Sequence, residues 1–219
     1  MLGGISAGYG ASWFPARIGE DMYIIGITGP SGAGKSSAMH ALESLGALSL
    51  DCDEIYHKLL ISSEHMTSEI INRFGDVSTG GKIDRKKLRE IVFNDAVALE
   101  ALNTITHKYV WEELDREIRA FNKRGGEIAS VDAIALFESS FNKECDVVVG
   151  VLAPKEQRIS RIMKRDGLTR EQAESRVFAQ QDDSFYIHNC DYILENPYKN
   201  QREFMTKCIE FFDQLVHDI

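Results

Sequence analysis

Short apolar runs alternate along the chain with longer segments in which apolar residues recur every three or four positions. The runs have the length of a β-strand and lie at residues 22–28, 47–51, 127–137, 146–153 and 191–196. Nearly continuous apolar runs are typical of strands that are buried on both faces of a parallel sheet. Their alternation with helical segments predicts an α/β fold, a doubly wound parallel sheet of five strands that binds its ligands at the carboxyl ends of the strands.

Between the second and third runs the pattern is helical over most of residues 66–125. Within this stretch, residues 74–88 carry three glycines and are expected to form a loop. The sequence therefore predicts a helical insertion at residues 66–125, in a core made of residues 22–65 and 126–219.

The first 21 residues differ from the rest of the chain. They hold five of the seventeen glycines and show neither a helical nor a strand period. A signal peptide needs an early positive charge and a solid apolar stretch, and this segment has neither. We expect a disordered extension, with Met22 as the functional start, so that deletion of residues 1–21 leaves activity intact.

The first apolar run leads directly into GPSGAGKS, residues 29–36, which fits the phosphate-loop pattern G-x-x-x-x-G-K-[ST]. The glycines allow the chain to turn with its N–H groups pointing inward, and the N-terminus of the following helix completes an anion site. Lys35 is expected to reach the β- and γ-phosphates, and the Ser36 hydroxyl to bind Mg²⁺. The predicted nucleotide-binding residues of the loop are Gly32, Ala33, Gly34, Lys35, Ser36 and Ser37.

Acidic residues follow two of the expected strands, at the edge of the sheet where substrates bind in such folds. A carboxylate at Asp53 can accept the proton of an attacking hydroxyl, although Asp at a strand-to-helix junction is also a common N-cap. Asp51 is the better candidate for the N-cap or for a water-mediated contact to Mg²⁺. Asp132 is expected to be a second carboxylate near Mg²⁺, with an ordinary strand-terminal Asp as the alternative.

A helix is expected to begin after Pro154 and to carry Arg158, Arg161 and Arg165 along one face. Such a stripe can close over a triphosphate and neutralise the charge that develops during transfer, although a charged stripe is more often a solvated face. A capping box at residues 169–172 predicts a further helix. We expect a lid at about residues 158–185, in which Arg158 assists catalysis and Arg161 binds the nucleotide.

The insertion holds two candidate contacts to an acceptor. Arg85 comes at the end of the glycine-bearing loop and could reach the acceptor's phosphates, with a surface salt bridge as the alternative. His107 lies in the long helical stretch, where a single histidine is more often structural. Together with Asp53, these are the predicted substrate-binding residues.

Composition narrows the class of protein. A net charge of −9 and a pI near 5.2 argue against a surface that coats nucleic acid. The four cysteines are far apart without a C-x-x-C pair, which suits reduced thiols in the cytoplasm, and no apolar run approaches the roughly 20 residues of a membrane span. Oligomeric state is not readable from the sequence.

Several motifs in order resemble those of the dephospho-CoA kinase family. They are GAGKS at residues 32–36, LGALSLDCDEI at 45–55, FG at 74–75, KIDRKKLREIVF at 82–93, LNTITH at 102–107, LFE at 136–138, QR at 157–158, ESRVFAQQ at 174–181 and DYILEN at 191–196. The resemblance covers residues 23–196. It implies a phosphate-loop kinase core with a helical acceptor domain and a lid, and transfer of the γ-phosphoryl of ATP to the ribose 3′-hydroxyl of dephospho-CoA.

The resemblance also implies roles for the residues singled out above. Asp53 would be the base, Lys35 and the loop amides would hold the γ-phosphate, and Ser36 would bind Mg²⁺. Arg158 and its neighbours would be lid arginines, and Arg85 would contact the acceptor.

Three positions depart from the family's pattern. The family has Pro-Leu-Leu-Phe-Glu where this chain has residues 134–138, His-Pro where it has His107-Lys108, and GGIGSGKS where it has GPSGAGKS. None of these removes a chemical group that the reaction needs, but the first concerns the acceptor pocket.

Three alternatives remain. GPSGAGKS by itself looks like the loop of a guanylate kinase, and uridine kinases have close variants, yet residues 52–71 are not a Ser/Thr- and Arg-rich base-recognition segment. A GTPase switch would carry an Asn-Lys-x-Asp motif, which is missing from the sequence. A degenerate member of the family would bind CoA-like ligands without turnover.

Overall fold

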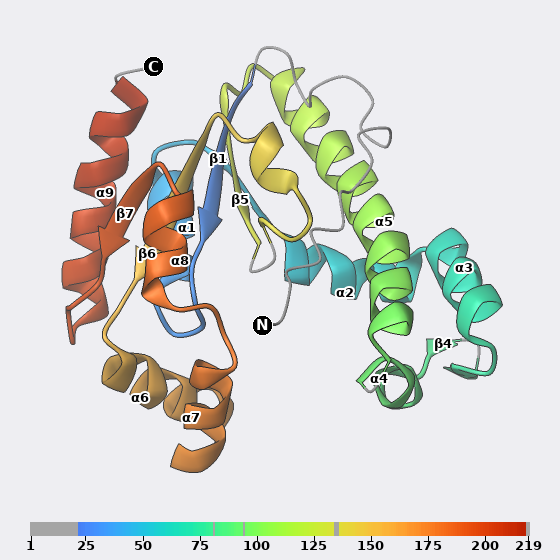
Figure 1. Cartoon of the computed structure of the whole chain (residues 1–219). Helices are drawn as coiled ribbons and strands as arrows, with labels where there is room; N and C mark the ends of the chain where they lie inside the picture. The colour runs from blue at the N-terminus through green and yellow to red at the C-terminus, as the bar shows by residue number, and fades with distance from the viewer. Residues whose placement is uncertain (1–21, 81, 94, 134–135, 218–219) are drawn as a thin grey trace.

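The computed structural model describes residues 22–80, 82–93, 95–133 and 136–217. Its centre is a parallel sheet with the strand order β2-β5-β1-β6-β7 (Figure 1). The strands are β1 (Tyr23–Thr28), β2 (Leu48–Asp51), β5 (Ile128–Asp132), β6 (Val147–Leu152) and β7 (Tyr192–Glu195). The expected fold class and the five expected strands are therefore confirmed.

The registers of the strands bring their carboxyl ends to one edge of the sheet. Asp51 of β2 is aligned with Asp132 of β5, which is also aligned with Ile27 of β1. The phosphate loop and the candidate carboxylates therefore leave the sheet at the same edge.

The third strand is shorter than the apolar run that predicted it. β5 ends at Asp132, and the chain then turns toward a short 3₁₀ helix, η1 (Phe141–Glu144). Leu136 and Phe141 are buried against the sheet although neither belongs to a strand. The apolar character of this stretch therefore serves packing. Ile134 and Ala135, which differ from the family's pattern, lie outside the described residues, as do residues 1–21.

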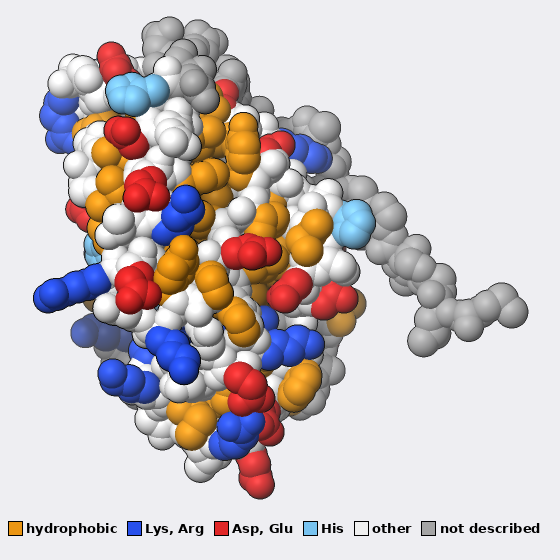
Figure 2. Space-filling model, turned by 90° about the vertical axis from the view of Figure 1, so that its left-hand side faces the viewer, with side chains coloured by type: hydrophobic (Ala, Val, Ile, Leu, Met, Phe, Trp, Pro, Cys, Tyr) orange, Lys and Arg blue, Asp and Glu red, His pale blue; other side chains and the backbone are white. Residues whose placement is uncertain are grey.

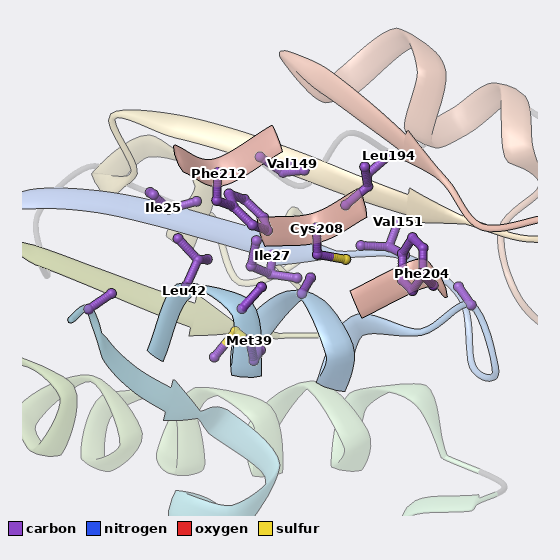
Figure 3. Close-up of a cluster of buried hydrophobic side chains, with 14 of the residues drawn as sticks. Ile25, Ile27, Met39, Leu42, Val149, Val151, Leu194, Phe204, Cys208 and Phe212 are labelled. Atoms are coloured by element: carbon purple, nitrogen blue, oxygen red, sulfur yellow. The ribbon is translucent and has the colours of Figure 1, made fainter. Parts of the chain in front are cut away.

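One face of the sheet is covered by α1 (Lys35–Ser44) and α9 (Gln201–His217). Their apolar side chains meet those of β1, β6 and β7 in a single cluster, in which Leu42, Phe204 and Phe212 lie among Ile25 and Val149 (Figure 3). The burial of the apolar face of α9 holds α1 against the sheet and hence holds the loop that precedes it.

The opposite face is covered by the C-terminal half of a long helix, α5 (Ala96–Asn122). Leu114 and Ile118 of this helix pack against Ile24 and Val131 of the sheet. The N-terminal half of α5 continues beyond the sheet into the insertion (Figure 1). One continuous helix therefore joins the insertion to the core.

The insertion packs around its own small apolar core. This core lies among α3 (Glu64–Phe74), β3 (Ser78–Thr79), β4 (Lys82–Ile83), α4 (Arg85–Phe93) and the first half of α5. α2 (Cys52–Ser62), which comes before the predicted limit at residue 66, also contributes Leu60 to it. Met66 and Ile70 of α3 contact Leu102 and Ile105 of α5 within this core. Part of the expected loop at residues 74–88 is an antiparallel hairpin of β3 and β4, so that expectation was incomplete. The limits of 66 and 125 stay a prediction.

The segment expected to form a lid begins with two helices, α6 (Lys155–Asp166) and α7 (Arg170–Phe178), which lie beyond the carboxyl edge of the sheet (Figure 1). α6 follows Pro154 as expected, and the predicted capping box of Thr169 and Gln172 is present at the start of α7. A separate apolar cluster that includes Ile162 and Val177 holds the two helices together. They are followed by α8 (Asp183–Asn189).

Acidic and basic side chains are mixed over the face shown in Figure 2, with hydrophobic side chains in a broken band between them. Ion pairs between such exposed side chains contribute little to stability. Among the helices of the described ranges, none combines the length and the apolar character needed to cross a membrane.

Candidate nucleotide and phosphoryl-transfer site

The phosphate loop between β1 and α1 depends on its glycines. Gly29 and Gly34 have φ of 136° and 119°, in the region that residues with a side chain rarely adopt. Gly34 is also crowded, because a Cβ built on it would lie 2.5 Å from Asn196 Nδ2 and 2.9 Å from Phe204 Cε1. The loop can therefore follow this path only with glycine at these positions.

Two carbonyl groups of the loop are held from within it. The Ala33 N–H donates to the Pro30 carbonyl at 3.1 Å, which closes a tight turn. The Lys35 ammonium donates to the Gly29 carbonyl at 3.2 Å. Both contacts satisfy carbonyl oxygens of the loop.

The next carbonyl groups are held by two arginines of α6. Arg158 Nε donates to the Ser31 carbonyl at 3.1 Å, across a separation of 127 residues in the chain. Arg161 Nη1 donates to the carbonyls of Gly32, at 2.9 Å, and Ala33, at 3.1 Å. The Arg158 side chain is only 2% exposed, and burial lowers the pKa of both guanidinium groups. These two predicted lid arginines therefore lie against the backbone of the phosphate loop.

Asn196, just after β7, holds the loop from a third direction. Its side-chain amide donates to the Ala33 carbonyl at 2.7 Å and accepts from Arg161 Nη2 at 3.3 Å. Arg161 Nη2 also donates to the Tyr198 carbonyl at 2.7 Å. Because the carboxyl ends of β1 and β7 lie at one edge of the sheet, residues far apart in sequence meet at this point.

The held carbonyls determine where the amides of the loop point. In a planar trans peptide the C=O and the following N–H point in opposite directions, so a carbonyl held behind the loop turns the next amide forward. Among the described residues, the N–H groups of Gly32 and Gly34 have no hydrogen-bond partner. Together with the N-terminus of α1, they form a concave site for anions.

Three carboxylates stand next to this loop. Asp51 accepts the N–H groups of Asp53, at 2.8 Å, and Glu54, at 3.1 Å, so Asp51 is the N-cap of α2. Asp53, freed from that role, is exposed in the first turn of α2. This arrangement confirms that Asp51, and not Asp53, is the capping residue.

Asp132 faces the loop lysine. Its Oδ1 lies 3.8 Å from Lys35 Nζ, and its side chain is 13% exposed. Burial raises the pKa of Asp132 to about 6, Lys35 opposes this rise, and the nearby charges of Asp51 and Asp53 add to it. The carboxylates named from the sequence are therefore neighbours that interact electrostatically.

The Oδ1 atom of Asp132 is buried and accepts no hydrogen bond from any described residue. The Lys35 ammonium, 3.8 Å away, is too far from this oxygen for a hydrogen bond, so the oxygen keeps room for a further donor or cation. In the part of the chain that the structure describes, no three metal-ligating side chains of His, Cys, Asp or Glu gather in one place. One carboxylate and one hydroxyl, that of Ser36, fit Mg²⁺, which keeps most of its ligands as water and phosphate oxygens.

The insertion places Arg85 beside a groove. Arg85 is the first residue of α4 and is exposed. It lines a groove of about 510 Å³. The groove is formed by His57, Leu60, Ile61, Lys82, Ile83 and Arg85. Its lining therefore combines apolar with cationic side chains.

His107 and Arg165 are not brought to the loop by any contact between described residues. Burial lowers the pKa of His107, so the imidazole is neutral at pH 7. Arg165 is exposed and binds its neighbour Asp166 at 2.7 Å. The predicted stripe of three arginines is therefore divided, with two on the phosphate loop and one at the surface.

Two residues at the site were not predicted to be functional from the sequence. Asn196 ended a predicted strand, and Gln180 belonged to a segment that carried the family resemblance. Gln180 Oε1 accepts the Ser31 N–H at 3.0 Å. No spacing rule relates either residue to the loop, because both contacts depend on the tertiary fold.

The fold and the site define the class of protein. A five-stranded parallel sheet, a glycine loop after its central strand and a lysine at the start of the following helix characterise the phosphate-loop kinases.

The comparisons name the family. A profile of the dephospho-CoA kinase family matches residues 23–201. A dephospho-CoA kinase of Moorella thermoacetica is 36% identical over 176 residues, which cover 79% of this chain and 83% of that protein. The chain belongs to the dephospho-CoA kinase family.

Two solved structures are similar to this chain in fold. The crystal structure of TT1252 from Thermus thermophilus has a TM-score of 0.76 and 29% identity, with 88% of this chain and 97% of the other covered. The dephospho-CoA kinase from Campylobacter jejuni has a TM-score of 0.64 and 28% identity, with coverages of 88% and 96%. The likeness therefore extends over nearly the whole length of both proteins.

Proposed function

We propose that this protein transfers the γ-phosphoryl group of ATP to the ribose 3′-hydroxyl of dephospho-CoA, the last step in the synthesis of coenzyme A. The observation that carries the proposal is the phosphate loop, whose carbonyls are held from behind while its amides face the anion site. Membership in the dephospho-CoA kinase family supports the choice of acceptor. The free cysteines suit a cytoplasmic location.

In this proposal the loop and its lysine bind the triphosphate. The amides of Gly32 and Gly34 and those at the start of α1 would donate to the phosphate oxygens, and the first turn of α1, including Ser37, would add its dipole. Lys35 Nζ would exchange the Gly29 carbonyl and Asp132 for the β- and γ-phosphates. The two guanidinium groups of Arg158 and Arg161 would add fixed positive charge behind the loop, and this charge would favour the negative charge that develops on the phosphates during transfer.

Asp53 is proposed as the base. Its carboxylate is exposed at the carboxyl edge of the sheet, and Asp51 already serves as the cap. The proton of the acceptor's 3′-hydroxyl would pass to Asp53 while the hydroxyl oxygen forms the new bond to the γ-phosphorus. The bond from that phosphorus to the β,γ-bridging oxygen would break, which leaves ADP.

Ser36 and Asp132 are the proposed residues for Mg²⁺, which would neutralise phosphate charge when bound. The buried Oδ1 of Asp132, which accepts no hydrogen bond and has Lys35 Nζ at 3.8 Å, supports this choice. The Ser36 hydroxyl lies exposed in the first turn of α1, beside the proposed triphosphate site.

Arg85 and His107 are proposed for the acceptor. Arg85 and Lys82, which line the groove, carry the charge that a pyrophosphate requires, and Leu60 and Ile61 add apolar side chains to its lining. His107, which burial keeps neutral, could contribute a hydrogen bond and no charge.

The test is release of ADP from ATP and Mg²⁺ by the purified protein with dephospho-CoA, GMP, uridine or no acceptor. Turnover with dephospho-CoA alone is expected. Asp53→Asn should lower kcat at least about 100-fold, as removal of a general base does. Glu54→Gln, an exposed carboxylate at the next position, is the matched control and should stay within about twofold. Turnover with GMP or uridine instead would indicate another small-molecule kinase, and ATP binding without turnover would indicate a degenerate family member.

A further inference from the structure

Gln180 lies in the turn between α7 and α8 and has no part in the proposed mechanism. Its side chain makes three hydrogen bonds at one point. Oε1 accepts the Ser31 N–H at 3.0 Å and Arg158 Nη2 at 3.0 Å, and Nε2 lies 3.1 Å from Ser31 Oγ. Its neighbour Gln181 is exposed and makes no hydrogen bond to a described residue. Of this pair of glutamines, only the first reaches the phosphate loop.

These bonds hold the peptide group before Ser31 on both sides. The N–H of this group donates to Gln180, and its carbonyl, that of Pro30, accepts the Ala33 N–H at 3.1 Å. Because the peptide is planar, two bonds in opposite directions prevent its rotation.

The peptide group after Ser31 is held through Arg158. Arg158 Nε donates to the Ser31 carbonyl at 3.1 Å, which turns the Gly32 N–H toward the anion site. Gln180 Oε1 in turn accepts from the same guanidinium, whose side chain is 2% exposed. Arg158 Nη1 is 3.8 Å from Asp183 Oδ1, too long for a hydrogen bond. Gln180 therefore fixes the orientation of the arginine that orients the loop.

We propose that Gln180 is a positioning residue for phosphoryl transfer. Through Ser31 and Arg158 it keeps the amides of the loop aimed at the ATP phosphates, without touching the nucleotide itself. The inference rests on the proposed assignment of this loop as the ATP site.

The test compares Gln180→Met with Gln181→Met in the full-length protein. Methionine has nearly the same length as glutamine but makes none of the three hydrogen bonds. Steady-state kinetics with varied ATP and varied dephospho-CoA, together with thermal unfolding, separate a positioning role from a structural one. Gln180→Met should lower kcat/KM for ATP about tenfold, the effect expected when bonds to a backbone amide and a buried charged group are lost. KM for dephospho-CoA should stay within about twofold, and Gln181→Met should match the wild type.

Two results would overturn the inference. One is an unchanged kcat/KM for ATP in Gln180→Met. The other is a lower unfolding temperature together with a lower kcat, while both KM values stay unchanged. Such a result would mean that fewer molecules are folded and that Gln180 has only a structural role. If Gln180→Met does not fold, Gln180→Ala decides, because it also removes all three hydrogen bonds and should lower kcat/KM for ATP to a similar extent; an unchanged kcat/KM there refutes the proposal. Wild-type protein without any ATP-dependent turnover would instead contradict the proposed function.

Discussion

The stability of the phosphate loop can be tested at Arg161, since its guanidinium serves five acceptors at once. These are the carbonyls of Gly32, Ala33 and Tyr198 and the side-chain oxygens of Gln157 and Asn196. Arg161→Met keeps most of the aliphatic side chain and removes all five bonds.

The expected loss of stability follows from these bonds. Each is worth about 0.5–1.5 kcal/mol, and water can reach part of this half-buried site, so the sum is about 3 kcal/mol. For a protein of this size each kcal/mol lowers Tm by about 2–4 °C, so Arg161→Met should melt about 6–12 °C below the wild type.

Arg165→Met is the matched control, one helical turn further along α6. Arg165 is exposed and pairs with the adjacent Asp166, an interaction worth about 0–1 kcal/mol. Circular dichroism at 222 nm during heating and in urea measures both variants. If Arg161→Met and Arg165→Met lose the same stability, or if Arg161→Met loses less than about 1 kcal/mol, the reasoning about the loop's carbonyls is wrong.

The remaining predictions concern Asp132 and Gly34. The folded-state pKa of Asp132 is raised from 3.8 to about 6, so the folded protein binds this proton more tightly than the unfolded chain. Between pH 4 and 6, stability should therefore fall as pH rises, by about 3 kcal/mol for a shift of this size, and Asp132→Asn should abolish that part of the slope. Urea unfolding without Mg²⁺ measures it, and equal slopes for the two proteins would contradict the assignment. In Gly34→Ala the added Cβ would clash with Asn196 and Phe204, and the alanine would have to adopt a positive φ. This substitution should therefore lower the free energy of unfolding by at least about 3 kcal/mol and abolish ATP binding. Gly46→Ala, with φ of 92° and no atom within 4 Å of the added Cβ, should cost about 1–2 kcal/mol and leave ATP binding unchanged; similar calorimetric ATP affinities for both variants would refute the steric argument.

Local features of the sequence were sufficient for much of the fold. The five strands, the phosphate loop, the capping box at Thr169 and the N-cap at Asp51 all depend on residues within a few positions of one another. Apolar periodicity, positive φ at glycine and side-chain caps act over that range. The strand predicted to reach residue 137 was too long, because an apolar residue such as Leu136 is buried in the same way whether it lies in a strand or a turn.

The sequence by itself determined that this protein has a phosphate loop at the edge of a parallel sheet, and which carboxylates lie near it. Only the tertiary structure decided what holds that loop. Arg158 and Arg161 contact its backbone while Arg165, on the same helix, faces solvent, and the amides of Gln180 and Asn196 reach it from more than a hundred residues away. The strand order places the ends of β1 and β7 at one edge of the sheet, and a hydrogen bond across that distance in the chain has no local sequence signal.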